Sequence, residues 1–128
     1  MTMRLVRGCV AFGLVAVVAL AGCAKSGIGA DARLTFDGSG NGTHSERANC
    51  DDSGRIGGSG DVTDGTVRVR VTDVDGTQLF SQDFEGDFDL DDQTLTGDSG
   101  EWKIEATRSG NDLAGDEFQG DYQFNLVC

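Results

Sequence analysis

Histidine is nearly absent from this sequence of 128 residues: His44 is the single one, and it lies in a polar stretch after Gly42. No G-x-S-x-G pattern surrounds any serine, so neither imidazole catalysis nor a serine nucleophile has its usual residues. Carboxylate pairs of the glycosidase type can always be picked from 22 Asp and Glu, but a domain of this size seldom holds two of them in a cleft. We therefore predict a protein that is not an enzyme, with His44 as a solvated residue.

Basic residues are scarce as well. Without residues 1–22, the chain carries 8 Lys and Arg against 22 Asp and Glu, a net charge of −14. Nucleic-acid binding depends on Lys and Arg that neutralise phosphates, so the sequence predicts no nucleic-acid partner. The acidity suits a cationic partner, a saline exterior or separation from anionic headgroups, and composition does not choose among them. The expected partner is an envelope protein or glycan, with a cationic one among the alternatives.

The sequence also lacks an apolar run long enough to remain in a membrane. The uncharged stretch over residues 8–22 has 15 residues, whereas a membrane-spanning helix needs about 20. Arg4 and Arg7 precede it, as in the positive region of an export signal. These features predict a signal helix over residues 1–22 that is cleaved from the mature protein.

Four residues at the end of this stretch resemble the lipobox of bacterial lipoproteins: Leu20, Ala21, Gly22 and Cys23. The resemblance implies that the Cys23 thiol receives a diacylglyceryl group and that cleavage occurs just before it. Residues 23–31 would then be a short lipid-anchored tether, with a reach of roughly 30 Å at about 3.3 Å per residue. The resemblance implies a membrane-anchored envelope protein, in the outer membrane of a Gram-negative cell or on the outer face of a monoderm plasma membrane. The alternatives are an ordinary secretory signal and an uncleaved anchor.

The four cysteines separate by position. Cys9 leaves with the signal and Cys23 takes the lipid, which leaves Cys50 and Cys128 in an oxidising compartment, where we expect them to form a disulfide. A metal pair or a redox couple is the alternative, but a zinc site needs four ligands and a thioredoxin-like couple needs C-x-x-C. Neither pattern is present.

The mature chain has an apolar period of two and no convincing helical spacing. The segment T-V-R-V-R-V-T over residues 66–72 places three valines on one face and two arginines on the other, as in a half-buried strand. Turn signals separate such segments, including Asp64-Gly65 and Asp75-Gly76. We predict an all-β domain over residues 32–128, a small antiparallel β-sandwich or barrel of about seven or eight short strands. The Gly- and Ser-rich residues 38–43 and 51–61 are interpreted as loops.

Strand parity assigns the core. The predicted inward residues include Leu34, Phe36, Phe80, Phe84, Phe88, Leu90, Trp102, Ile104, Ala106, Tyr122, Phe124, Leu126 and Cys128. On this parity Trp102 and Tyr122 are core residues, and the alternative is an aromatic platform for sugars. Three segments are together similar to jelly-roll modules appended to secreted bacterial enzymes: Asp73-Val74-Asp75-Gly76-Thr77, Gly100-Glu101-Trp102-Lys103-Ile104 and Gly120-Asp121-Tyr122-Gln123-Phe124-Asn125-Leu126. The overall plan consists of a lipobox, a short tether, a β domain and a cysteine that ends the last strand. It is also similar to small actinobacterial surface lipoprotein antigens, and no functional residue is transferred from either family.

Acidic residues offer the one candidate metal site. Carboxylates are ligands that calcium prefers, and Asp73-Val74-Asp75-Gly76 is similar to part of an EF-hand loop. Val71 and Gln82, however, occupy the positions of the first aspartate and of the glutamate. The alternative is a hairpin turn with a solvated acidic face, and no other cofactor is expected. The candidate calcium ligands are Asp73, Asp75, Asp87 and Asp89.

Overall fold

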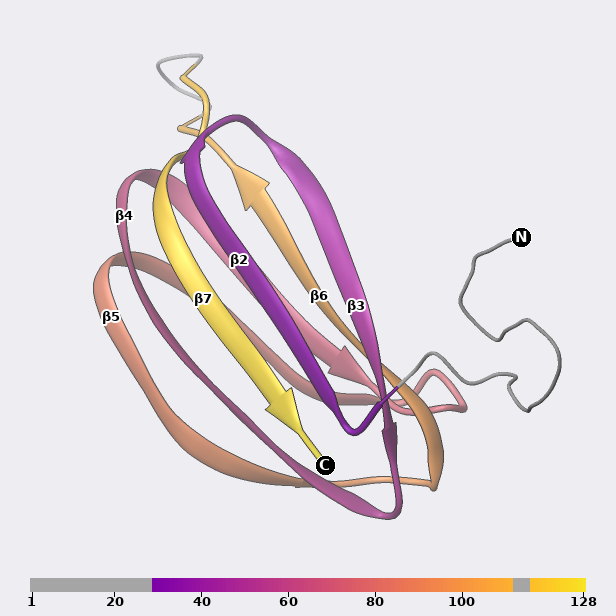
Figure 1. Cartoon of the computed structure of the whole chain (residues 1–128). Helices are drawn as coiled ribbons and strands as arrows, with labels where there is room; N and C mark the ends of the chain where they lie inside the picture. The colour runs from indigo at the N-terminus through magenta and orange to yellow at the C-terminus, as the bar shows by residue number, and fades with distance from the viewer. Residues whose placement is uncertain (1–28, 112–115) are drawn as a thin grey trace, which may run out of the picture.

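The computed structural model describes residues 29–111 and 116–128. The predicted signal peptide, Cys23 and most of the tether lie outside the described residues. The described chain is all-β, as predicted, and its strands pair antiparallel into a nearly closed barrel (Figure 1). The strands are β2 (Asp31–Ser39), β3 (Gly42–Cys50), β4 (Ser53–Thr72), β5 (Gln78–Thr96), β6 (Gly100–Ser109) and β7 (Gln119–Val127).

Two long strands explain why the described chain has six strands and not seven or eight. β4 and β5 have 20 and 19 residues, and both bend where the β4–β5 register shifts between Val62 and Val67. The predicted turn at Asp64-Gly65 is therefore wrong as a hairpin, because the strand continues through it. A turn does occur at Asp75-Gly76, where β4 reverses into β5.

The bend divides the barrel into two halves of four strand segments each. The first half-sheet has the order β2, β7, β4 (residues 53–64) and β5 (residues 86–96). The second half-sheet has the order β3, β6, β4 (residues 66–72) and β5 (residues 78–84). Eight segments in two facing four-stranded sheets, connected in this order, make a jelly roll.

The core lies between the half-sheets and follows the predicted parity. Trp102 is fully buried and Tyr122 is 3% exposed, so both are core residues, which leaves no face of either for a sugar platform. Phe124 packs at the centre, with ring centroids 5.3–5.6 Å from those of Phe84, Phe88 and Tyr122. The interior of this barrel is filled by side chains, as in other small barrels.

The loop prediction for residues 51–61 is wrong from residue 53 onward, because β4 begins there. The reason is cross-strand packing. A Cβ at Gly58 would lie 2.6 Å from the Phe124 ring, and one at Gly60 would lie 2.8 Å from the Phe88 ring. These glycines make room for aromatic rings of the neighbouring strands, so a segment that has loop composition is a central strand. The loop predicted over residues 38–43 is also shorter, since only Gly40 and Asn41 lie outside strands.

The predicted disulfide between Cys50 and Cys128 is present, with a Cα–Cα distance of 5.0 Å. It lies at the end of the barrel where β2 begins, because the carbonyls of Gly29 and Ala30 accept hydrogen bonds from the amides of Asn49 and Cys128. The incoming chain and the C-terminus therefore meet at one end, called the tether end below (Figure 1). In the described part of the chain, no helix has the length and apolar character of a membrane span.

Candidate functional site

The turn after β4 is organised by one nearly buried carboxylate. Asp73 is 7% exposed, and its Oδ1 accepts hydrogen bonds from the amides of Asp75 and Thr77, both at 3.0 Å. Its Oδ2 accepts a third from the amide of Asp98 at 3.2 Å. The carbonyl of Asp98 in turn accepts a hydrogen bond from Trp102 Nε1 at 2.7 Å. Asp73 therefore links the β4–β5 turn to the connection between β5 and β6.

The pKa values of the two aspartates in this turn are shifted in opposite directions. Burial disfavours the charge of Asp73, but the backbone amides around it outweigh burial and lower the pKa of this carboxyl. A hydrogen bond with the Asp98 side chain raises the pKa of Asp75, and the negative charges of Asp98 and Asp73 raise it further. At neutral pH the turn thus holds one well-stabilised carboxylate and one that is repelled by its neighbours.

Three carboxylates converge here, and one of them was not predicted. One oxygen each of Asp73, Asp75 and Asp98 lies within 4.8 Å of the others. Asp98 comes from the distant connection before β6, so no local pattern links it to Asp73. Both oxygens of Asp73 already accept backbone hydrogen bonds, which leaves the exposed Asp75 and Asp98 as the freer ligands. The group offers few of the six to eight oxygens that calcium takes.

The other two predicted ligands, Asp87 and Asp89, lie elsewhere, on the outer face of β5 in the first half-sheet. Their neighbours reveal a feature that sequence analysis missed. Asp37 of β2 pairs with Asp121 of β7, Asp121 pairs with Asp61 of β4, and Asp61 pairs with Asp87. All four are exposed, and residues directly opposite in an antiparallel pair share a face. These four residues, called the aspartate row below, form an unbroken line across four strands.

The outer face of the second half-sheet has a different charge pattern, because its acids face cations. Arg68 Nε donates to Asp83 Oδ1 at 2.7 Å, and the Arg68 guanidinium lowers the pKa of that carboxyl. Further ion pairs on this face join Arg47 to Glu101, and Arg70 and Lys103 to Glu105. Among the described residues, no ion pair includes a member of the aspartate row.

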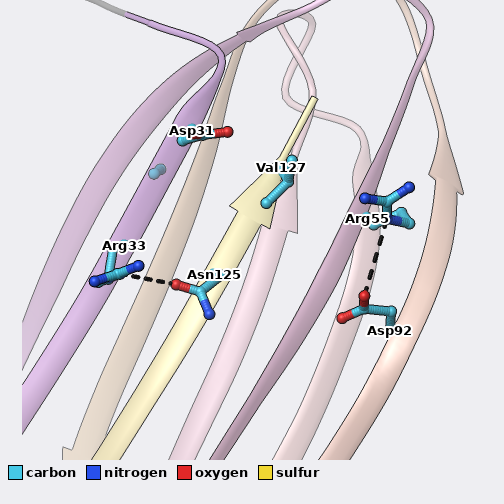
Figure 2. Close-up of a pocket in the computed structure, with 7 residues that line it drawn as sticks. Asp31, Arg33, Arg55, Asp92, Asn125 and Val127 are labelled. Atoms are coloured by element: carbon cyan, nitrogen blue, oxygen red, sulfur yellow. Dashed lines mark hydrogen bonds and ion pairs between the residues drawn. The ribbon is translucent and has the colours of Figure 1, made fainter.

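Two hollows lie on the outer face of the first half-sheet. One of about 270 Å³ lies at the tether end, where Arg33 donates to Asn125 at 3.1 Å and Arg55 approaches Asp92 at 3.9 Å (Figure 2). The other, of about 380 Å³, lies over the aspartate row. Its lining includes three members of the row together with the polar residues Ser39, Thr63 and Gln119.

His44, in the polar stretch after Gly42, lies in β3. Its side chain is 44% exposed, and Nε2 lies 3.2 Å from Glu46 Oε2. The imidazole is therefore solvated, as predicted, and it contacts Glu46, a neighbour on the same strand.

Comparisons with known proteins assign no family. No protein-family model matches the chain, and no curated protein does. Among solved structures, one similar chain belongs to "Structure of infectious bursal disease virus Gx strain", with 15% sequence identity and a TM-score of 0.30. The similarity covers 76% of this chain and spans about a third (33%) of that one.

Proposed function

We propose that this chain is a lipid-anchored lipoprotein of the bacterial envelope, and that its jelly-roll domain is a non-catalytic binding or structural module. The observation that carries the proposal is the filled interior. The aromatic and aliphatic side chains between the half-sheets leave the outer faces as the surfaces that can meet a partner.

The tether end supports the membrane attachment. β2 begins at Asp31, eight positions after Cys23, and the preceding carbonyls are hydrogen-bonded next to the Cys50–Cys128 bridge. A domain held at this end would lie close to the lipid surface, with the outer faces of both half-sheets exposed at the sides of the barrel and not covered by the membrane. Two or three acyl chains anchor a protein far more firmly than one.

Metabolic labelling with palmitate in a bacterial host tests the anchor. The wild-type chain should incorporate label, and the Cys23→Ser variant should lose it together with sedimentation in the membrane fraction. Cys9→Ser is the matched control, because Cys9 lies before the predicted cleavage site, and it should be labelled like the wild type. Label retained in Cys23→Ser would contradict the proposal.

A cation-binding module is the second candidate, favoured by the convergence of Asp73, Asp75 and Asp98. Thermal melts of the purified lipoprotein in millimolar calcium and in EDTA separate the two candidates. We expect equal melting temperatures, because backbone amides already occupy both oxygens of Asp73. A rise in calcium that the Asp98→Asn variant abolishes would establish the second candidate instead.

A further inference from the structure

We propose that the aspartate row docks an extended basic segment of a cationic polypeptide partner. This inference rests on the proposed function and names the chemistry of the partner. The row is formed by Asp37, Asp121, Asp61 and Asp87.

The register of the sheet places four like charges side by side. Cβ atoms of directly opposite residues lie about 4.5–5.5 Å apart, and like charges in such positions destabilise a sheet. Asp61 and Asp121 each have an aspartate on both sides. An arrangement that costs stability in the free protein, on a face open to solvent, is compensated when cations are supplied from outside.

The chain has cations, but it places them elsewhere. On the outer face of the second half-sheet, four cations are paired with acids of that face: Arg47, Arg68, Arg70 and Lys103. Arg108 of β6 donates to the Gly40 carbonyl and the Tyr122 hydroxyl and lies over the Phe36 ring. On the outer face of the first half-sheet, Arg33 and Arg55 lie beside the tether-end hollow (Figure 2). Arg33 is four residues from Asp37 along β2, about 13 Å at 3.3 Å per residue, and its Nε donates to Asn125. The row is therefore the part of this face where negative charge stands without compensation from the described residues.

The spacing of the row fits an extended basic chain. Neighbouring strands lie about 4.8 Å apart, so the row spans about 14 Å from β2 to β5. Residues i and i+4 of an extended segment are separated by nearly the same distance, about 13.6 Å, and the residue between them points the same way. Three basic side chains at alternate positions can thus lie along the four carboxylates. Ser39, Thr63 and Gln119 add polar groups at the edge of the same hollow.

A single metal ion fits this geometry less well. Calcium requires six to eight oxygens that converge at 2.3–2.6 Å, whereas the row sets its carboxylates in a line on a sheet. A line of charges is matched by a line of opposite charges, which is what a lysine- or arginine-rich segment provides.

Fluorescence anisotropy with a labelled peptide tests the inference. The full lipoprotein is held in phosphatidylcholine nanodiscs, and the probe is a short peptide in which lysine and serine alternate. The row variant carries Asp37→Asn, Asp61→Asn, Asp87→Asn and Asp121→Asn. The control variant removes the same number of charges from exposed acids outside the row, with Asp51→Asn, Asp52→Asn, Asp116→Asn and Glu117→Gln.

We expect the row variant to bind the peptide at least about tenfold more weakly and the control less than about twofold, because close charge pairs act locally while net charge acts through steering. Equal losses in both variants would overturn the inference, since net charge alone would then explain binding. Displacement of the peptide by millimolar calcium, with calcium itself bound to the wild type and not to the row variant, would also overturn it in favour of a metal site.

Two further measurements keep the outcome interpretable. Asp61→Asn alone replaces the row variant if the fourfold change prevents folding, and it should weaken binding by about threefold or more, because it removes the charge at the centre of the row. Palmitate labelling of the same proteins reports the anchor separately. A row variant that binds the peptide like the wild type would overturn the docking site and leave the lipid-anchored module standing.

Discussion

At the scale of single residues, the Asp73 turn shows how two neighbouring acids acquire opposite roles. Asp73 is a structural acceptor for three backbone amides, and Asp75 is its repelled neighbour. The turn that contains Asp73 was predictable, since Asp-x-Asp-Gly between two strands is a turn signal. The hydrogen bond from the amide of Asp98 was not, because the tertiary structure alone brings that residue to the turn.

This difference predicts opposite pH effects of two substitutions. The lowered pKa of Asp73 contributes stability above about pH 3.9, the unfolded value, which is lost as the pH falls through the folded pKa. Asp73→Asn should therefore lower the melting temperature at pH 7, with a smaller difference in acid.

The raised pKa of Asp75 has the opposite effect on stability, because the charged form of this carboxyl is disfavoured in the folded state. Asp75→Asn should raise the melting temperature at pH 7 and have little effect below about pH 3.9. Parallel pH profiles for the two variants would contradict this assignment.

The aspartate row predicts a stabilising substitution. Asp61 faces Asp121 on one side and Asp87 on the other, so Asp61→Asn removes two unfavourable cross-strand pairs. We expect a gain of about 0.5–1 kcal/mol in the free energy of unfolding, measured by urea denaturation at low salt. The gain should shrink with added salt, because salt screens exposed charges. Asp51→Asn, at an exposed turn position, is the control and should change stability little; a loss of stability in Asp61→Asn would show that the row is not repulsive.

At the scale of elements, the period-two pattern predicts most of the strands and their inward faces, because each strand has one buried side. Trp102, Ile104 and Ala106 are buried as their alternation indicates. The pattern fails where a glycine stands at an inward position, as at Gly58 and Gly60. There, aromatic rings of neighbouring strands occupy the space that a side chain would fill. β4 bends at Asp64-Gly65, where a hairpin turn was predicted. The Asp-Gly pair indicates that the backbone changes direction there, but it does not say whether the chain reverses.

Two glycines in the left-handed region provide a matched test of that bend. Gly65 has φ +88° and Gly76 has φ +85°, but a Cβ at Gly65 would lie 2.9 Å from Gly110 Cα, whereas one at Gly76 has open space. Gly76→Ala should cost about 1 kcal/mol, the conformational penalty alone. Gly65→Ala should cost more than about 2 kcal/mol, because the strand against β6 must also move. Equal losses in urea denaturation would mean that the bend tolerates a side chain.

At the scale of the whole molecule, strand order decides what the surface presents. The members of the aspartate row come from four strands and are separated by 24 residues or more in the sequence, so no local motif could reveal them. Only the order β2, β7, β4, β5 with its register aligns them. The acidity of the chain was visible in its composition. The alignment of four aspartates that form no ion pair among the described residues, while acids of the other face pair with cations, is a property of the jelly roll.

The Cys50–Cys128 bridge links the last strand to β3 at the tether end, across a sequence separation of 78 residues. A loop of this length lowers the entropy of the unfolded chain enough to contribute about 4.5 kcal/mol in the chain-entropy model. We expect the Cys50→Ala, Cys128→Ala double variant to lose about that much in urea denaturation, a large fraction of a small domain's stability. The wild type treated with reductant should match the double variant, and reductant should leave the double variant unchanged. A loss below about 1 kcal/mol would show that backbone pairing of β7 with β2 and β4 holds the C-terminus without the bridge.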